Sequence, residues 1–177
     1  HRVVDAAALA DEGVGPGSLI LFQNLAATAI ERRIEAGERG GILMLPAGSG
    51  KTRIALRAIR NHLATIITPN SVVPAWRSEV GKVLTQPSML VLHGEGHEAR
   101  KEKLRENPDA EVVVLSKHFV RNTKDMKRYE LLNARKKQGK KRVKIEDEGH
   151  SLQHESKQTE GSRMIETDFH LILSATP

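Results

Sequence analysis

The sequence predicts an α/β domain in which helices cover both faces of a parallel sheet. Apolar runs of about five residues, typical of buried strands, alternate with stretches that carry apolar residues at helical spacing. Strands that alternate with helices in this way form parallel βαβ units with right-handed crossovers. A loop of small residues at 46–50 also separates the first apolar run from a helical stretch, and the 177 residues suffice for one well-packed core.

The predicted elements follow this alternation along the chain. An approach segment at residues 1–18, with acidic residues and glycines, precedes the domain at residues 19–177. Helices are expected at residues 19–36, 51–62, 72–83, 95–106, 117–134 and 156–166. Strands are expected at residues 41–45, 64–68, 88–92, 111–115, 142–146 and 170–174.

The loop after the first strand has the composition of a phosphate-binding loop. Small residues let its backbone N–H groups and the following helix N-terminus face phosphate oxygens. Lys51 is expected to contact the β- and γ-phosphates, and Thr52 to offer its hydroxyl to magnesium. The alternative is a glycine-rich turn that contains Lys and Thr by chance. The candidate nucleotide-binding residues are Pro46, Ala47, Gly48, Ser49, Gly50, Lys51 and Thr52.

An acidic pair follows the strand expected at residues 142–146. Asp147 and Glu148 would therefore emerge at the C-terminal end of a parallel strand, where open α/β sheets bind ligands. Asp147 is suited to hold magnesium, usually through water, and Glu148 to orient or deprotonate an attacking water. An acidic pair can also be ordinary solvated loop charge. Its combination with a phosphate-binding loop favours phosphoryl transfer.

Four segments together resemble a known family. They are residues 40–43, residues 66–79, residues 147–153 with the pair Ser156–Lys157 beyond them, and residues 171–177. They are similar to the motifs of the first RecA-like lobe of superfamily-two helicases, a P-loop NTPase fold, and most similar to those of the Swi/Snf-type DNA translocases. The similarity runs from about residue 21 to residue 177. A restriction-type or RNA helicase lobe of the same superfamily is the alternative.

This resemblance implies a DNA-dependent ATPase that uses ATP and Mg²⁺, with Lys51, Asp147 and Glu148 as catalytic residues. Gln23 matches a glutamine that pairs with the adenine edge, although it also suits an ordinary exposed helix position. The implied nucleic-acid contacts are Pro69, Asn70, Ser71, Ser116 and Lys117. The implied coupling residues, which link nucleotide state to the lobe interface, are His150, Ser174 and Thr176.

The resemblance also implies partners outside the chain. They are double-stranded DNA contacted through its backbone, a second RecA-like lobe that supplies an arginine, and chromatin proteins, with a nuclear location in a eukaryote and a cytoplasmic one otherwise. The start in mid-pattern at His1 and the end at Pro177 suggest a piece of a longer protein. A scaffold that keeps the fold without turnover is the contrasting class, and it would not need Lys51, Thr52, Asp147 and Glu148 together.

Composition fits these expectations. The formal net charge of +6 favours a polyanionic partner, and the scarcity of aromatics, 3%, disfavours a base-stacking platform. The basic run at residues 135–142 suits either a phosphate backbone or a solvated connection between helix and strand. Trp76 is expected to be a packing residue rather than a DNA contact. Cysteine is absent, which excludes disulfides and thiol chemistry, and no apolar run reaches the length of a membrane span.

Overall fold

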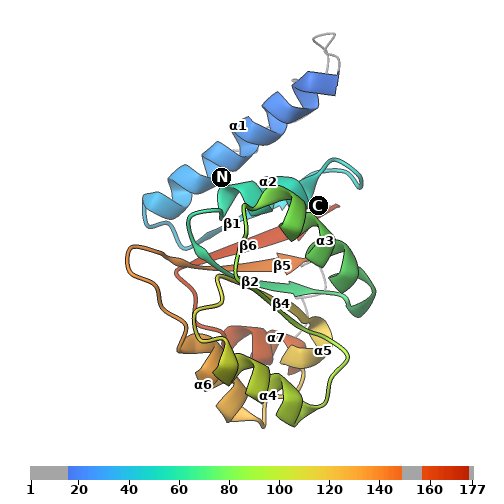
Figure 1. The fold of residues 1–177 in the computed structure, drawn as a ribbon. Helices are drawn as coiled ribbons and strands as arrows, with labels where there is room; N and C mark the ends of the chain where they lie inside the picture. The colour runs from blue at the N-terminus through green and yellow to red at the C-terminus, as the bar shows by residue number, and fades with distance from the viewer. Residues whose placement is uncertain (1–15, 149–156, 176–177) are drawn as a thin grey trace.

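The computed structural model describes residues 16–148 and 157–175, and its centre is a six-stranded parallel sheet (Figure 1). The strands are β1 (Gly40–Met44), β2 (Leu63–Thr68), β3 (Met89–Leu92), β4 (Val112–Ser116), β5 (Arg142–Asp147) and β6 (Phe169–Ser174). Their order in the sheet is β1-β6-β5-β2-β4-β3, and every neighbouring pair is parallel. The predicted fold class and all of the predicted strands are confirmed, with boundaries that differ by no more than about one residue.

Helices lie on both faces of the sheet (Figure 1). One face packs against α1 (Pro16–Glu35), α2 (Lys51–Ala58) and α3 (Val73–Val83), which follows the short 3₁₀ helix η2 (Asn70–Val72). The other face packs against α4 (His97–Glu106), α5 (Lys117–Val120), α6 (Met126–Asn133) and α7 (Lys157–Arg163). Within the described residues, no helix is both long enough and apolar enough to cross a bilayer.

Several predicted helix boundaries are wrong. The helix expected at 51–62 ends at Ala58, and the helix expected at 156–166 ends at Arg163. The first helix begins at Pro16, so the last residues assigned to the approach segment 1–18 belong to α1. The single helix expected at 117–134 is divided into α5 and α6. Its interruption has a physical cause, because the buried side chain of Arg128 donates hydrogen bonds to the carbonyl oxygens of Phe119 and Asn122. Those carbonyls are thereby satisfied outside a continuous helix.

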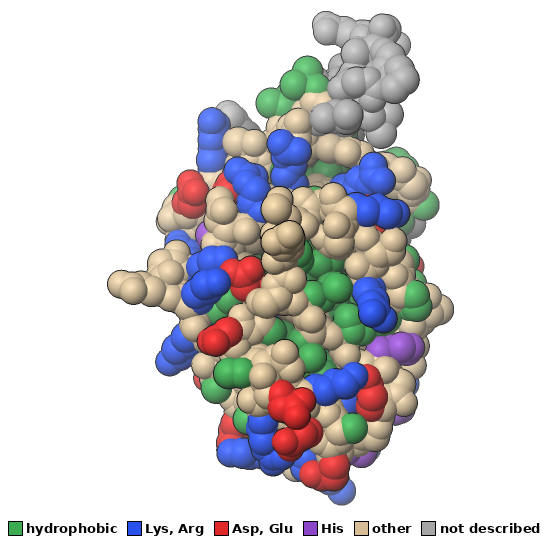
Figure 2. Space-filling model, viewed as in Figure 1, with side chains coloured by type: hydrophobic (Ala, Val, Ile, Leu, Met, Phe, Trp, Pro, Cys, Tyr) green, Lys and Arg blue, Asp and Glu red, His purple; other side chains and the backbone are tan. Residues whose placement is uncertain are grey.

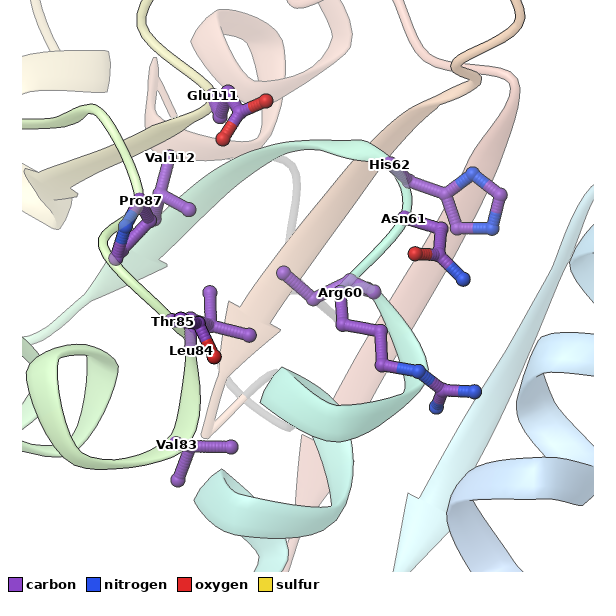
Figure 3. Close-up of a pocket in the computed structure, with 10 residues that line it drawn as sticks. Arg60, Asn61, His62, Val83, Leu84, Thr85, Pro87, Glu111 and Val112 are labelled. Carbon is purple, nitrogen blue, oxygen red and sulfur yellow. The ribbon is translucent and has the colours of Figure 1, made fainter.

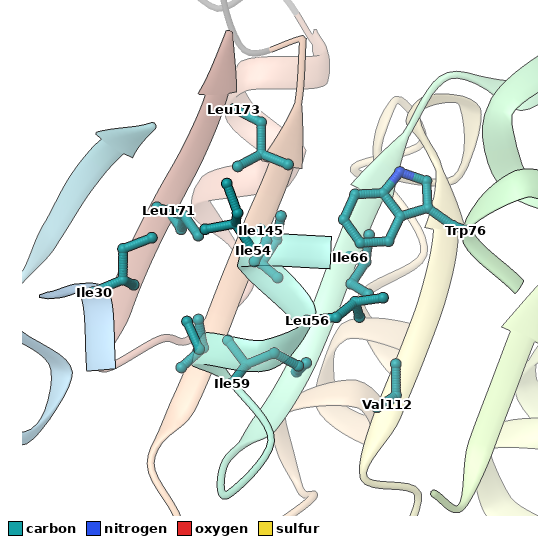
Figure 4. Close-up of a cluster of buried hydrophobic side chains, with 14 of the residues drawn as sticks. Ile30, Ile54, Leu56, Ile59, Ile66, Trp76, Val112, Ile145, Leu171 and Leu173 are labelled. Carbon is teal, nitrogen blue, oxygen red and sulfur yellow. The ribbon is translucent and has the colours of Figure 1, made fainter. Parts of the chain in front are cut away.

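The core consists of two hydrophobic layers, one on each side of the sheet. Figure 4 shows part of the first layer, where Ile54 and Leu56 of α2 meet Ile66, Ile145 and the aromatic ring of α3. Every residue of β2 and β4 is buried, as expected for central parallel strands covered on both faces. This packing holds the strand ends, and therefore the loops that follow them, in a fixed arrangement.

The basic run at residues 135–142 is bound into the fold. Arg135 is 6% exposed and donates to the carbonyl oxygens of Ala64 and Ala110 at 3.3 and 3.0 Å. The Lys141 ammonium donates to the carbonyl oxygen of Ile34 at 2.6 Å. The run leads into the start of β5, so it lies at the N-terminal edge of the strands. It is a structural part of the domain rather than a mobile connection.

Glu111 accepts hydrogen bonds from two lysines of this run, Lys137 and Lys140, each at 2.6 Å. These ammonium groups lower the pKa of Glu111 to about 2. Because this pKa lies below that of the unfolded chain, about 4.3, the stabilisation is complete above pH ~4.3 and is lost as the pH falls towards about 2.

We therefore expect Glu111→Gln to lower the free energy of unfolding at pH 7 and to have little effect near pH 2. Urea denaturation of both proteins across this range measures the difference. Glu130→Gln is the matched control, since Glu130 forms an exposed ion pair with Lys127 and should change stability by less than about 1 kcal/mol. If Glu111→Gln lowered the free energy of unfolding equally at pH 2 and at pH 7, the ion pairs of Glu111 would not be the source of its stabilising effect.

Candidate functional site

The candidate site residues meet at one edge of the sheet. All six strands are parallel, so their C-terminal ends share an edge, which is the usual ligand-binding edge of open α/β sheets. The phosphate-binding loop follows β1, the acidic pair ends β5, and β6 lies between them. Two strand spacings correspond to about 10 Å, a distance that a magnesium–triphosphate group can span. The candidate nucleic-acid residues lie at the same edge, directly after β2 and at the junction of β4 with α5.

The loop at 46–50 has the backbone conformation that a phosphate-binding loop requires. Gly48 and Gly50 have φ angles of 78° and 84°, and α2 begins directly at Lys51. The Lys51 ammonium lies over the loop and donates to the carbonyl oxygens of Leu45 and Pro46 at 2.7 and 2.9 Å. The predicted strand–loop–helix context is thus present, with Thr52 in the first turn of α2.

Gln23 lies against this loop from α1. Its Nε2 atom donates to the carbonyl oxygen of Ser49 at 3.4 Å, and a Cβ atom on Gly50 would lie 2.3 Å from the same nitrogen. Gly50 is favoured by its positive φ, whereas the end of the Gln23 side chain could move away from a Cβ atom at this position. The expected place of Gln23 beside the nucleotide loop agrees with this geometry, and its adenine contact stays a prediction.

Asp147 is held by two buried donors. Its Oδ2 atom accepts hydrogen bonds from Trp76 Nε1 at 2.8 Å and from Thr68 Oγ1 at 3.1 Å. Trp76 is 1% exposed and Thr68 0% exposed. Trp76 is therefore a core residue, as predicted, but its polar end also contacts the acidic pair. Sequence reasoning missed both donors, because no spacing pattern links residues so distant along the chain to Asp147.

Glu148 and Lys117 form a second contact at this edge. Glu148 is exposed and has a φ of 54°, a left-handed conformation that is uncommon for a residue with a side chain and is frequent at functional sites. The Lys117 ammonium donates to the carbonyl oxygen of Glu148 at 3.1 Å. Burial lowers the pKa of Lys117, and the charges of Glu148 and Asp147 oppose that shift. Lys117 thus joins the end of β4 to the acidic pair.

The remaining predicted site residues differ in accessibility. Asn70 and Ser71 are exposed in η2, Pro69 is half-buried, and Ser116 is only 2% exposed, so its hydroxyl offers little surface to a ligand. Ser174 is buried at the end of β6, where its carbonyl oxygen accepts a hydrogen bond from the Leu45 amide at 3.2 Å. The other two predicted coupling residues, His150 and Thr176, lie outside the described residues.

These residues fit a magnesium nucleotide. The loop glycines and the start of α2 form an anion-binding turn, and Lys51 stands over it. Among the described residues no hydrogen bond reaches the Oδ1 atom of Asp147, which leaves it for a magnesium-bound water. The described residues contain no group of three or more acidic or histidine side chains suited to a metal. Magnesium is usually held by one or two protein carboxylates together with phosphates and water.

Two cavities lie elsewhere. One, of about 270 Å³, is lined by the connections that lead into β2, β3 and β4, and includes Arg60, His62 and Glu111 (Figure 3). It is therefore at the N-terminal edge of the strands. The other, of about 380 Å³, is lined by β3, the segment after it and the start of α3. Neither cavity borders the phosphate-binding loop. On the face shown in Figure 2, hydrophobic side chains reach the surface in the middle, and basic and acidic side chains are intermixed around them.

The parallel sheet, the phosphate-binding loop and the acidic pair at one edge define the RecA-like lobe of a superfamily-two, helicase-like ATPase domain. The family model described as "Type III restriction enzyme, res subunit" matches residues 18–177. The chain belongs to this family. No curated protein matches the chain.

A solved structure from Sulfolobus solfataricus, the SWI2/SNF2 ATPase core in complex with dsDNA, is similar with a TM-score of 0.70. The match has 17% sequence identity and covers 88% of this chain but 31% of that chain. It therefore supports the fold alone. The predicted superfamily is confirmed, the family model is of the restriction type that was the alternative, and a Swi/Snf-type chromatin role stays a prediction.

Proposed function

We propose that this chain is the ATP-binding lobe of a DNA-dependent ATPase that moves along double-stranded DNA. The observation that carries the proposal is the edge where the phosphate-binding loop, the acidic pair and the two candidate nucleic-acid loops meet. Hydrogen bonds from Lys117 to Glu148 and from Thr68 to Asp147 join those loops to the acidic pair. The similar Sulfolobus core was solved with dsDNA, which supports duplex DNA as the partner.

In this proposal each residue has a separate task. Lys51 binds the β- and γ-phosphates, while Thr52 and Asp147 hold magnesium. Glu148 accepts a proton from the water that attacks the γ-phosphorus, and the bond from that phosphorus to the ADP oxygen breaks. Magnesium, when bound, neutralises charge on the phosphate oxygens. A second RecA-like lobe would supply an arginine and exclude water, so the lobe alone is expected to hydrolyse ATP negligibly.

A DNA-binding experiment tests the partner. We expect Ser71→Asp to weaken duplex binding by about tenfold, because the exposed η2 would then present a negative charge to a DNA phosphate. Ser78→Asp is the matched control, since Ser78 is exposed on α3 and gives the same change in net charge. Fluorescence anisotropy with a labelled duplex over a series of salt concentrations measures both. Equal losses in the two variants would contradict a contact at residues 69–71.

The same salt series decides the role of the basic run. Replacing Lys136, Lys137, Lys140 and Lys141 by Gln should leave the slope of log affinity against log salt unchanged, because the run lies at the opposite edge of the sheet. A slope reduced by about 0.9 for each lost contact would instead place the run on the DNA backbone.

A further inference from the structure

The loop that carries Pro69, Asn70 and Ser71 is tied at both ends to one oxygen atom of Asp147. Thr68, the last residue of β2, directly precedes the loop, and Trp76 follows it in the first turn of α3. Both side chains donate to Oδ2 of Asp147, at 3.1 and 2.8 Å. The exposed η2 lies between the two donors along the chain. A displacement of this loop therefore acts on the carboxylate through both of its ends.

The two donors are well placed to orient the carboxylate. Both are fully buried, so their hydrogen bonds are shielded from water, and bonds to a charged group are stronger than those between neutral groups. Figure 4 shows Trp76 among the core side chains, with its ring nitrogen towards the end at which the strand arrows terminate. Because both bonds go to Oδ2, they restrict rotation of the carboxylate and leave Oδ1 for a ligand at the sheet edge.

We propose that Thr68 and Trp76 are positioning residues that orient Asp147 for magnesium and transmit occupancy of the 69–71 loop to the nucleotide site. The inference rests on the proposed function for its nucleic-acid part only. Coupling between two binding sites is reciprocal, so duplex DNA should tighten magnesium-nucleotide binding by the same factor by which the nucleotide tightens DNA binding. The bridge of Thr68, Trp76 and Asp147 is the physical connection for that coupling.

Trp76 provides a direct spectroscopic readout, because it is the chain's one tryptophan. A magnesium ion bound near Asp147 changes the charge beside the indole N–H. We expect the fluorescence of the wild-type protein to shift when Mg²⁺ and a non-hydrolysable ATP analogue are added together, and to shift much less with the analogue in EDTA. Asp147→Asn should remove the Mg²⁺-dependent part. A spectrum unaffected by Mg²⁺ in the wild-type complex would overturn the positioning role.

Thr68 provides a test that leaves the tryptophan in place. Thr68→Val keeps the side-chain shape but removes the donor, whereas Thr68→Ser keeps the hydroxyl. We expect Thr68→Val to need about tenfold more Mg²⁺ for half-maximal binding of a labelled ATP analogue, as the loss of one hydrogen bond to a charged group predicts. Its affinity in EDTA should stay unchanged, and Thr68→Ser should behave like wild type. Equal Mg²⁺ requirements in all three proteins would overturn the proposal.

An experiment with duplex DNA distinguishes a failure of this inference from a failure of the proposed function. In the wild-type protein, saturating duplex DNA should tighten binding of the magnesium–analogue complex, and in Thr68→Val and Trp76→Phe this effect should fall towards onefold. DNA that binds without changing nucleotide affinity would overturn the coupling. A complete failure to bind DNA would overturn the proposed function, while the Mg²⁺ dependence would still decide whether Thr68 and Trp76 position Asp147.

Discussion

Replacement of Glu148 by Gln is expected to stop ATP hydrolysis while ATP binding stays nearly intact. Glu148 is exposed directly after β5, at the same sheet edge as the phosphate-binding loop and two strands away from it, where its carboxylate can take a proton from the attacking water. Glutamine keeps the shape of the side chain but cannot act as a base. Loss of a general base costs about 10²- to 10⁴-fold in rate. Phosphate release, measured with a protein that carries the second lobe and with duplex DNA, should fall by this factor.

Lys51→Ala, in contrast to Glu148→Gln, should act on ATP binding. Its ammonium stands over the loop carbonyl oxygens, in the position where it would meet the phosphates, so its removal should weaken ATP binding directly. Titration of a labelled ATP analogue compares the two variants. Arg57→Ala is the matched control, since it removes a positive charge from the exposed side of the same helix. Normal turnover by Glu148→Gln would show that another residue activates the water.

Gly161→Ala is expected to cause a large loss of stability. Gly161 lies in α7 against the end of α5, and a Cβ atom there would lie 1.7 Å from the carbonyl oxygen of Val120 and 2.7 Å from the hydroxyl of Tyr129. The first neighbour is backbone, so α7 or α5 must move. Overpacking of this kind costs about 1–3 kcal/mol and occasionally more. The expected result is a lower melting temperature and a lower urea midpoint.

Gly81→Ala provides the contrasting control. Gly81 lies in α3 with no atom within 4 Å of its potential Cβ, so alanine meets open space there. Alanine is the better helix former, and the substitution should raise stability by about 0.5–1 kcal/mol. Two identical changes in two helices are thus expected to have opposite signs. A Gly161→Ala protein as stable as wild type would contradict the close approach of α7 to α5.

The strands and the phosphate-binding loop could be predicted because their signals are local. Runs such as residues 64–68 and 112–115 consist mainly of apolar and β-branched residues, and Gly48, Gly50 and Lys51 lie within four consecutive positions. The division of the helix expected at 117–134 could not be predicted, because it depends on the buried contacts of Arg128 with backbone carbonyls. Helical periodicity alone does not reveal such a competing hydrogen bond.

The burial of charged side chains inside the domain could not be predicted from the sequence either. Lys144 and Glu146 of β5 are buried, with 5% and 2% exposure, and the hydrogen bond of each with Ser162 of α7 offsets the cost of burial. Arg135 belongs to the basic run that suited either a phosphate backbone or a solvated connection, yet its guanidinium donates to carbonyl oxygens at the N-terminal edge of the sheet. In each case the partner belongs to a different element, and only the packing of the two elements brings it close.

The sequence by itself determined the alternation of strands and helices, the phosphate-binding loop and the acidic pair, because each depends on residues adjacent along the chain. Only the tertiary structure decided that Thr68 and Trp76 donate to Asp147, across 79 and 71 positions of the chain. That contact requires β5 to lie beside β2. Which strands become neighbours depends on how all the crossover helices pack over both faces of the sheet, and no local pattern of residues contains that information.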